Sequence, residues 1–219
     1  GRIRRQRQMC IRDRNWADMS LRDFQAALAS SSPTPGGGTA AAIALAQAAS
    51  LSVMVSDLTV SNEKWNDGWA VANKVLALSI PLMNRANDLA TDDSDAFDGV
   101  MDGFAMPKGT DDEKAARRTA IRSATLVAAE VPYETARLAL NLLDLLPDLA
   151  RKGNANAVTD VGVAGLLASA AAKGAVFNVE INLDSLPSEM GAVIRDRLPE
   201  LKEQMLSLIH ISEPTRPYL

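Results

Sequence analysis

Apolar side chains recur every three or four residues along most of the chain, and this spacing constrains the fold more than any other feature. Just before "RKG", for example, the stripe consists of Leu138, Leu142, Leu145 and Leu149. Residues at this spacing lie on one side of an α-helix, where they pack against a neighbouring element. We find no convincing alternation of period two and no β-hairpin signal. The sequence therefore predicts an all-α fold.

Capping residues and helix breakers predict where the helices begin and end. Ser20 and Thr110 each precede an acidic residue three positions later, a pattern typical of a helix start. Pro81 and Pro132 are expected to bend or restart helices. The predicted helices cover residues 20–28, 39–59, 64–90, 91–106, 110–129, 138–149 and 157–173, with an extension to 178 left open, and a last one follows Pro187. Short connections favour a single-domain antiparallel bundle, in which the Ala- and Ser-rich helix 39–59 is central because small side chains allow close packing.

Both ends of the chain resemble translated sequencing-library adapter rather than native protein. The segments "MCIRD" and "LSLIHI" can be encoded by reverse-complementary DNA. The alternative is a native basic arm and a native tail. Foreign segments are excluded from fold reasoning, so we expect residues 1–14 and 206–219 to be adapter-derived and residues 15–205 to form the domain.

This division removes several kinds of chemistry from the domain. Cys10 and His210 both fall in the adapter-like ends, so disulfides, Cys/His metal sites and histidine-based triads are not expected. The ends also carry 7 of the 23 basic and 2 of the 27 acidic residues, so the net charge changes from −4 to −9. A nucleic-acid role requires a basic face, and a domain this acidic gives no sign of one, so no nucleic-acid partner is expected. Acid–base chemistry is expected to use Asp, Glu, Lys, Tyr or the substrate itself.

The sequence was also searched for signal peptides and membrane-spanning segments. No signal peptide is recognised, and the most apolar run, 40–55, is rich in Ala and Ser and contains Gln47. A membrane span requires about 20 strongly apolar residues, so this run is predicted to be a buried helix. We expect a soluble, cytoplasmic protein that does not bind a membrane.

Three segments contain candidate functional residues, and the first is "SPTPGGGTAA". Its glycines formally fit a dinucleotide fingerprint, but no strand precedes them, and a Walker loop would require a lysine. No nucleotide is therefore expected. Two interpretations stay open for Pro35, Gly36, Gly37 and Gly38: a tight turn, or a backbone surface at a helix N-terminus for a flat ligand or an anion.

The other two segments are polar. On a helix that runs from Asp88 through "TDDSDAFDGVMDGF", Asp88, Asp92, Asp95 and Asp102 share a face while Asp93 points elsewhere. This face is either solvated, or able to take part in proton transfer or to hold a cation. Lys108 follows in a loop, where a lysine is normally solvated. In the third segment, residues 152–182, Asn154, Asn156 and Asp160 lie at a helix start, and Asn178 and Asn182 lie near its end. Capping explains one or two of these, whereas Asp160 among small apolar residues would need a specific partner.

Taken in order, these segments resemble the cyclodeaminase/cyclohydrolase family. That family comprises the C-terminal domain of formiminotransferase-cyclodeaminase and stand-alone methenyltetrahydrofolate cyclohydrolases. The resemblance covers nearly all of residues 20–205 and is carried by "PGGG", "DSDAF", "PK", "NAN", "TD" and "NVEIN". One departure is "VSNEKWND", where many relatives have a Gly-Lys element; Lys64 either replaces that lysine or the role is lost. The resemblance implies an all-α homodimer that binds a tetrahydrofolate derivative.

The resemblance also implies an activity. The preferred one is hydrolysis of 5,10-methenyltetrahydrofolate to 10-formyltetrahydrofolate. The alternatives are formiminotetrahydrofolate cyclodeaminase activity, which would fit a missing fused formiminotransferase domain, and a non-catalytic folate-binding or structural module. Neither reaction requires a metal. Asp93 or Asp160 is expected to act as the acid–base, Lys108 to position water or substrate, and the glycines and asparagines to bind the substrate.

Overall fold

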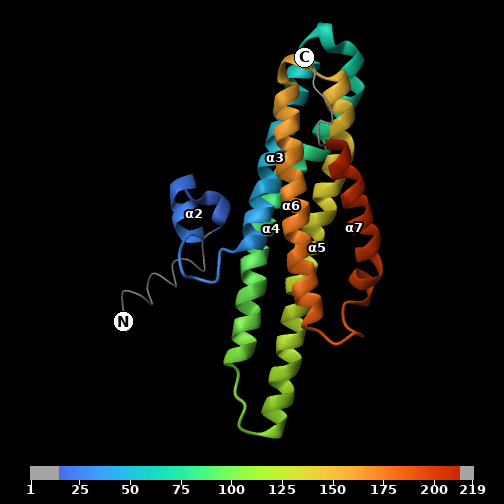
Figure 1. The fold of residues 1–219 in the computed structure, drawn as a ribbon. Coiled ribbons are helices and arrows are strands. Elements are labelled where there is room, and N and C mark those ends of the chain that lie inside the picture. The colour runs from blue at the N-terminus through green and yellow to red at the C-terminus, as the bar shows by residue number, and fades with distance from the viewer. Residues whose placement is uncertain (1–14, 213–219) are drawn as a thin grey trace.

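The computed structural model describes residues 15–212, with side chains to Leu208, and every regular element in that range is helical (Figure 1). The helices are α2 (Leu21–Leu28), α3 (Gly37–Val60), α4 (Trp69–Ala105), α5 (Asp111–Lys152), α6 (Val158–Asp184) and α7 (Ala192–Ser212). Short 3-10 turns occur at Trp16–Asp18, Glu63–Gly68 and Ala155–Ala157. The predicted all-α fold is confirmed.

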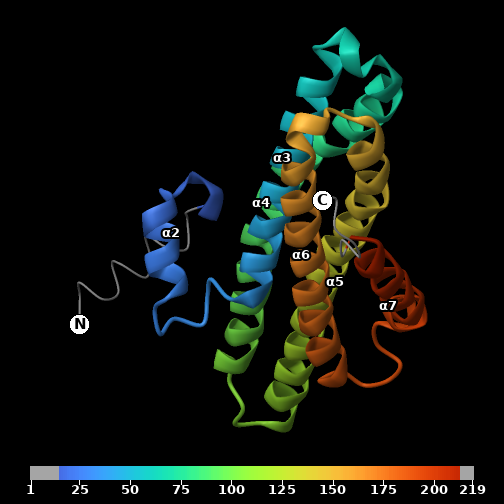
Figure 2. The same cartoon turned by 45° about the horizontal axis from the view of Figure 1, so that its top comes forward.

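Four long helices form the body of the molecule. Helix α3 packs against α4 and α6, and α5 packs against the same two helices, so the four form a closed ring. Short connections reverse the chain between successive helices, which gives the predicted antiparallel bundle. Helix α7 lies along α5 and α6, and α2 lies to one side of the bundle beside the start of α3 (Figures 1 and 2).

Small side chains allow α3 and α6 to approach closely. A Cβ placed on Gly174 of α6 would lie 3.5 Å from the Cβ of Ala41 on α3. The hydroxyls of Ser52 and Thr59, both fully buried, donate to backbone carbonyls four residues earlier on α3. Each hydroxyl therefore donates its hydrogen bond within α3 and does not need an acceptor on a neighbouring helix.

Two of the bundle helices, α3 and α6, are long and apolar enough to cross a membrane by length and composition. About half of each, 56% and 50% of the most apolar window, is buried inside the bundle. Core helices of compact domains pass the same test, and burial among neighbouring helices accounts for this apolar composition. The expectation that the protein does not bind a membrane stays a prediction.

The expected helix boundaries are partly wrong. Residues 64–90 and 91–106 were expected to be two helices, but α4 is continuous through Pro81; α5 is likewise continuous through Pro132 and Pro147. A proline within a helix costs about 3 kcal/mol, and the flanking turns of α5 are held by buried residues such as Ala129, Ala136 and Leu146. Tertiary packing thus outweighs the local preference for a break.

The expected ends of the domain are only partly within the described residues. Residues 1–14, which include Cys10, and residues 213–219 lie outside them. Helix α7 continues from the predicted domain end at 205 through residues 206–212. The assignment of 1–14 and 206–219 to adapter stays a prediction.

The packing of α3 can be tested with one enlarged side chain. Ala48 is fully buried in the core, whereas Gln47 beside it is exposed. We expect Ala48→Leu to lower the free energy of unfolding by about 1–3 kcal/mol because the core has no room for the added carbons. Thermal unfolding followed by circular dichroism measures the loss. Gln47→Leu is the control; equal effects of the two substitutions would contradict close packing at Ala48.

Candidate active site

The N-terminus of α3 packs directly against the carboxylate of Asp93 on α4. The hydroxyl of Thr39 donates to Asp93 Oδ2 over 2.9 Å. A Cβ on Gly38 would overlap the carboxyl group of Asp93, so only glycine permits this approach. Gly36 is the N-cap residue and follows the buried Pro35, while Gly37 is exposed beside them. The glycine segment is therefore both a tight helix start and one wall of a site.

Behind Asp93 lies a chain of hydrogen bonds that ends on its carboxylate. Trp16 Nε1 donates to Ser94 Oγ over 2.8 Å, and Ser94 Oγ lies 3.1 Å from Thr39 Oγ1. Because the Thr39 hydroxyl donates to Asp93, Ser94 is the donor to Thr39. Trp16 and Ser94 are almost fully buried, so they fix the orientation of Thr39. Neither residue was predicted from the sequence, and only the proximity of Ser94 to Asp93 in the chain could have indicated one of them.

Burial raises the pKa of Asp93 above its ordinary value of 3.8, because the carboxylate loses contact with water. Hydrogen bonds from the hydroxyl and the backbone N–H of Thr39 act in the opposite direction without cancelling the effect. A carboxylate with a raised pKa is a stronger base than an ordinary aspartate. Asp93 therefore has the properties of a proton acceptor.

Helix α6 brings Asn178 to the same place. The amide nitrogen of Asn178 would lie 3.9 Å from a Cβ on Gly37, and it donates to the carbonyl of Gly174 over 2.8 Å. Its amide oxygen accepts no hydrogen bond from residues 15–212. The structure thus gathers Gly36, Gly37, Gly38, Asp93 and Asn178 at one position, although they come from three separate sequence segments.

Other predicted site residues lie elsewhere in the chain. Asn154 donates its side-chain N–H to Leu58 O over 3.3 Å and accepts from the backbone of Asn156, so both belong to the turn beside the C-terminus of α3. Asp160, half-buried, lies in the first turn of α6. It is 18 residues from Asn178 along this helix, which corresponds to about 27 Å. One chain therefore does not bring Asp160 near Asp93.

Asn182 and Lys108 also lie away from Asp93. Asn182 donates to the carbonyl of Ala128 over 2.7 Å and so ties α6 to α5. Lys108 is exposed in the connection between α4 and α5. Lys64, the candidate replacement lysine, lies beyond the C-terminus of α3 with its ammonium 4.8 Å from the ring centre of Trp65.

The acidic face of α4 is partly neutralised by an arginine. Arg85 binds both carboxylate oxygens of Glu134 on α5, over 2.9 and 2.8 Å, and also Asp92 Oδ2 over 2.9 Å. The hydrogen bonds from Arg85 lower the pKa of Glu134. Asp92 and Asp93 therefore differ although they are neighbours: Asp92 joins an ion-pair network between helices, and Asp93 faces the start of α3.

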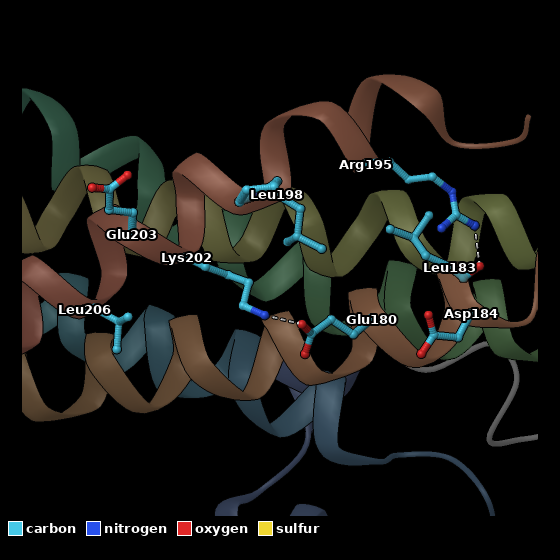
Figure 3. Close-up of a pocket in the computed structure, with 9 residues that line it drawn as sticks. Glu180, Leu183, Asp184, Arg195, Leu198, Lys202, Glu203 and Leu206 are labelled. Atoms are coloured by element: carbon cyan, nitrogen blue, oxygen red, sulfur yellow. Dashed lines mark hydrogen bonds and ion pairs between the residues drawn. The ribbon is translucent and has the colours of Figure 1, made fainter. Parts of the chain in front are cut away.

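A larger hollow, of about 560 Å³, lies between α6 and α7 but contains none of the predicted site residues (Figure 3). Lys202 points toward Glu180 across it, at 2.5 Å. Arg195 donates to the backbone carbonyls of Leu183 and Leu186. The two cations of this hollow, Lys202 and Arg195, are thus already paired with groups of α6 and the following turn. We interpret this hollow as the seam where α7 attaches to the bundle.

Comparison with known proteins gives a consistent family. The sequence pattern of the formiminotransferase-cyclodeaminase family matches residues 20–197. A methenyltetrahydrofolate cyclohydrolase of Methylorubrum extorquens is 40% identical over 183 residues, 84% of this chain and 87% of that protein. A formimidoyltransferase-cyclodeaminase of Gallus gallus is 30% identical over 177 residues, 81% of this chain but 33% of that protein.

A solved structure is also similar. The crystal structure of formiminotetrahydrofolate cyclodeaminase from Thermotoga maritima superposes with a TM-score of 0.78 at 27% identity, covering 90% of this chain and 95% of that one.

The burial of Asp93 predicts a pH-dependent stability. The pKa of Asp93 is raised in the folded state, so ionisation of this group opposes folding. The stability that protonated Asp93 contributes is complete below pH 3.8, and it is lost as the pH rises through the raised pKa. We therefore expect Asp93→Asn to be more stable than wild type at pH 7, with the difference vanishing toward pH 3.8. Urea unfolding at several pH values measures this.

The exposed carboxylate of Asp88, five residues earlier on α4, provides a matched control. Asp88→Asn removes the same charge without changing a buried group, so its stability should follow that of the wild type across the pH range. If Asp93→Asn gave no gain at pH 7 over this control, the proposed cost of burying the carboxylate would be wrong.

Proposed function

The chain belongs to the formiminotransferase-cyclodeaminase family, and we propose on that premise that it hydrolyses 5,10-methenyltetrahydrofolate to 10-formyltetrahydrofolate. The similarity to the Methylorubrum cyclohydrolase, 40% identical and matched over most of both chains, supports this reaction over the others in the family. The observation that carries the proposal is the half-buried Asp93 carboxylate against the glycine start of α3.

In this reaction, water adds to the cationic carbon that bridges N5 and N10 of the folate. Asp93 accepts a proton from the water as its oxygen bonds to that carbon. The bond from this carbon to N5 then breaks, the hydroxyl becomes the formyl carbonyl on N10, and its proton passes to N5. The proton held by Asp93 leaves to solvent, so that one proton is released in each turnover.

The groups around Asp93 suit the flat, polar ring of such a substrate. Without side chains, Gly36 and Gly37 let a ring lie against the backbone, and the first N–H groups of α3 provide donors. Asn178 offers an amide oxygen with no partner in residues 15–212. We assign to these residues the binding of the pterin ring and to Asp93 the proton transfer.

Cyclodeaminase activity is the second candidate. Closure of 5-formiminotetrahydrofolate with release of ammonia also needs an acid–base group near a delocalised cation. The Thermotoga structure, 27% identical, is that of a formiminotetrahydrofolate cyclodeaminase and covers 90% of this chain. The Gallus gallus relative is about three times as long as the matched region, which agrees with the expectation of a fused transferase domain in some relatives.

The roles of the two candidate aspartates can be separated by substitution. We expect Asp93→Asn to lower kcat for methenyltetrahydrofolate by about 10²–10⁴-fold, the usual contribution of a general base. Asp160→Asn, a change of the same kind about 27 Å away along α6, should retain most of the activity. The decay of methenyltetrahydrofolate absorbance gives both rates, with thermal melts to show that each variant is folded.

Several outcomes would contradict this assignment. Full activity of Asp93→Asn would exclude Asp93 as the base, and loss of activity only in Asp160→Asn would transfer the role to Asp160. Turnover of 5-formiminotetrahydrofolate without hydrolysis of the methenyl compound would favour the cyclodeaminase. Tight folate binding by wild type without any turnover would favour the non-catalytic module.

We also propose that the active protein is a homodimer joined through α3 and α6. The outer sides of these helices expose apolar side chains: Met54, Leu58, Val163, Leu166, Phe177 and Ile181. Leu166 and Phe177 are 63% and 69% exposed. Single exposed apolar residues are ordinary, but a contiguous apolar face marks an interaction site. The face belongs to the helices that carry the glycine segment and Asn178, so the partner subunit would lie close to the site.

The dimer can be tested with one charge. Leu166→Glu would place a carboxylate in the proposed interface, where it would have no partner, and we expect it to shift the protein to monomer. Val193→Glu on α7, at a side chain 66% exposed but outside this face, is the control. Sedimentation velocity measures both. A wild-type monomer, or a dimer unaffected by Leu166→Glu, would contradict the proposal.

A further inference from the structure

A small second core attaches the N-terminal segment, residues 15–28, to the bundle beside the start of α3 (Figure 1). Trp16 is its largest member and is 4% exposed; it shares this core with Phe24 of α2, Ala42 of α3, and Leu89 and Ala90 of α4. The ring of Phe24 meets the indole edge-on, with the ring centres 6.5 Å apart. Close packing on these sides fixes the plane of the indole, so its N–H group points in one direction.

That N–H group begins the chain of hydrogen bonds that ends on Asp93. The indole nitrogen of Trp16 can only donate, and its acceptor is Ser94 Oγ at 2.8 Å. Between residues 15 and 212, the only other hydrogen-bond partner of Ser94 Oγ is the hydroxyl of Thr39. Trp16 thus supplies Ser94 with a donor, and the proton of Ser94 goes to Thr39.

The hydroxyl of Thr39 has one proton and two neighbouring oxygens that can accept it. Thr39 Oγ1 lies 2.9 Å from Asp93 Oδ2 and 3.1 Å from Ser94 Oγ. While Trp16 donates to Ser94, the Thr39 proton is left for Asp93. Without the indole N–H, Thr39 would be the only donor to Ser94 among the described residues. Because a buried hydroxyl is stabilised by accepting as well as donating, Ser94 would then compete with Asp93 for one proton.

Charged side chains do not provide another control of Asp93. Its pKa is set by burial and by hydrogen bonds from Thr39, and no charged side chain of the described residues contributes. Helix α3 carries no charged residue before Asp57. Arg85 and Lys202 pair with three of the carboxylates on the surrounding helices. The charged residues on the elements around this site are Asp18, Arg22 and Asp23 in the N-terminal segment, Asp88, Asp92 and Asp95 on α4, Glu130 and Glu134 on α5, and Lys173 and Glu180 on α6.

We propose that Trp16 is a positioning residue for Asp93: by donating to Ser94, its indole N–H keeps the single hydroxyl proton of Thr39 on the Asp93 carboxylate. The role in catalysis rests on the proposed function, since it takes Asp93 to be the base. The hydrogen bond from Thr39 lowers the pKa of Asp93, so losing part of it raises that pKa further. The N-terminal segment, although outside the four-helix ring, therefore helps to set the pH at which the candidate base ionises.

The first experiment measures the ionisation of Asp93 directly. Trp16→Phe keeps an aromatic ring in the small core but removes the N–H donor. In protein labelled with ¹³C at aspartate carboxyl groups, the Asp93 resonance is assigned by its absence in Asp93→Asn. We expect Asp93 to titrate about half a pH unit to one pH unit higher in Trp16→Phe than in wild type, as for the loss of one modest hydrogen bond.

A double variant tests the competition for the Thr39 proton. Trp16→Phe/Ser94→Ala removes the competing acceptor together with the indole N–H, so the Thr39 hydroxyl again has only Asp93 to donate to. We expect the titration midpoint of Asp93 to return close to the wild-type value, which is a non-additive effect of two neighbouring changes. A double variant that titrates like Trp16→Phe alone would contradict the mechanism.

Two controls separate the hydrogen bond from a loss of packing. Phe24→Leu loosens the same small core without removing the N–H of Trp16. Trp69→Phe removes another indole N–H, one that donates to Thr59 O over 3.0 Å at the opposite end of α3. Neither change should move the titration midpoint of Asp93, whatever it does to the melting temperature. If Phe24→Leu shifted the midpoint as much as Trp16→Phe does, Trp16 would have a structural role only and the inference would be wrong.

A measurement on the wild-type protein does not depend on the folding of any Trp16 variant. A charge at one end of a hydrogen-bond chain polarises the bonds along it, so the indole ¹⁵N–¹H resonance of Trp16 should shift with the same midpoint as the Asp93 carboxyl. The resonance of Trp69 is the internal control and should not follow that midpoint. Trp65→Phe and Trp69→Phe assign the three indole signals. A Trp16 resonance that stays constant while Asp93 ionises would overturn the inference.

Turnover then separates this inference from the proposed function. We expect the pH profile of kcat/KM for methenyltetrahydrofolate to move upward in Trp16→Phe by the same amount as the Asp93 titration. If the titration responds to Trp16→Phe but no folate is turned over, the positioning role stands and the proposed function fails. If the folate is hydrolysed with a profile that depends on Asp93 but is unchanged in Trp16→Phe, the positioning role is wrong and the proposed function stands.

Discussion

The contact between the backbone of Gly38 and the carboxylate of Asp93 is the constraint on which the rest of this structure depends. It sets how closely the start of α3 approaches α4, because any side chain at position 38 would occupy the place of the carboxylate. The same contact removes water from Asp93 and so raises its pKa. The close packing of α3 on α4 and the basicity of Asp93 therefore both depend on this one contact.

This contact is stable because a buried network surrounds it. Trp16, Ser94 and Thr39 pass hydrogen bonds toward Asp93, and each donor in the chain has an acceptor, as buried polar groups require. The segment before α2 is thereby fastened to α4, although it lies outside the four-helix ring. The oriented Thr39 holds the carboxylate of Asp93 in place. The cost of burying Asp93 is consistent with a functional role, since an asparagine would fit the same position without that cost.

The sequence was sufficient for the helical class, for the helix starts at Ser20 and Thr110, and for the close packing of α3. These features depend on local patterns: side-chain period, a hydroxyl cap and small residues. It was insufficient for the continuity of α4 and α5, since Pro81, Pro132 and Pro147 favour breaks locally and only contacts made by neighbouring helices outweigh them. Of the candidate site, the glycines, Asp93 and Asn178 are gathered at one place. Asn154, Asn156 and Asp160 are not, because helices of this length hold their two ends far apart.

The break "SSPTPGGG" therefore has two consequences that its composition does not reveal. It separates α2 from α3 and starts α3 at Gly37. Beyond this point, α4 continues for about three turns past Asp93, and α6 continues for nearly two turns past Asn178. One end of the bundle therefore contains all four helices of the ring, and the other end contains only α4, α5 and α6. A surface that α3 would otherwise cover is left open at that second end. The residues on that surface are not those of a core: Phe97 and Phe104 are partly exposed, and cations follow them. The position of one helix start thus determines both where Asp93 is buried and how far a ligand can extend from it.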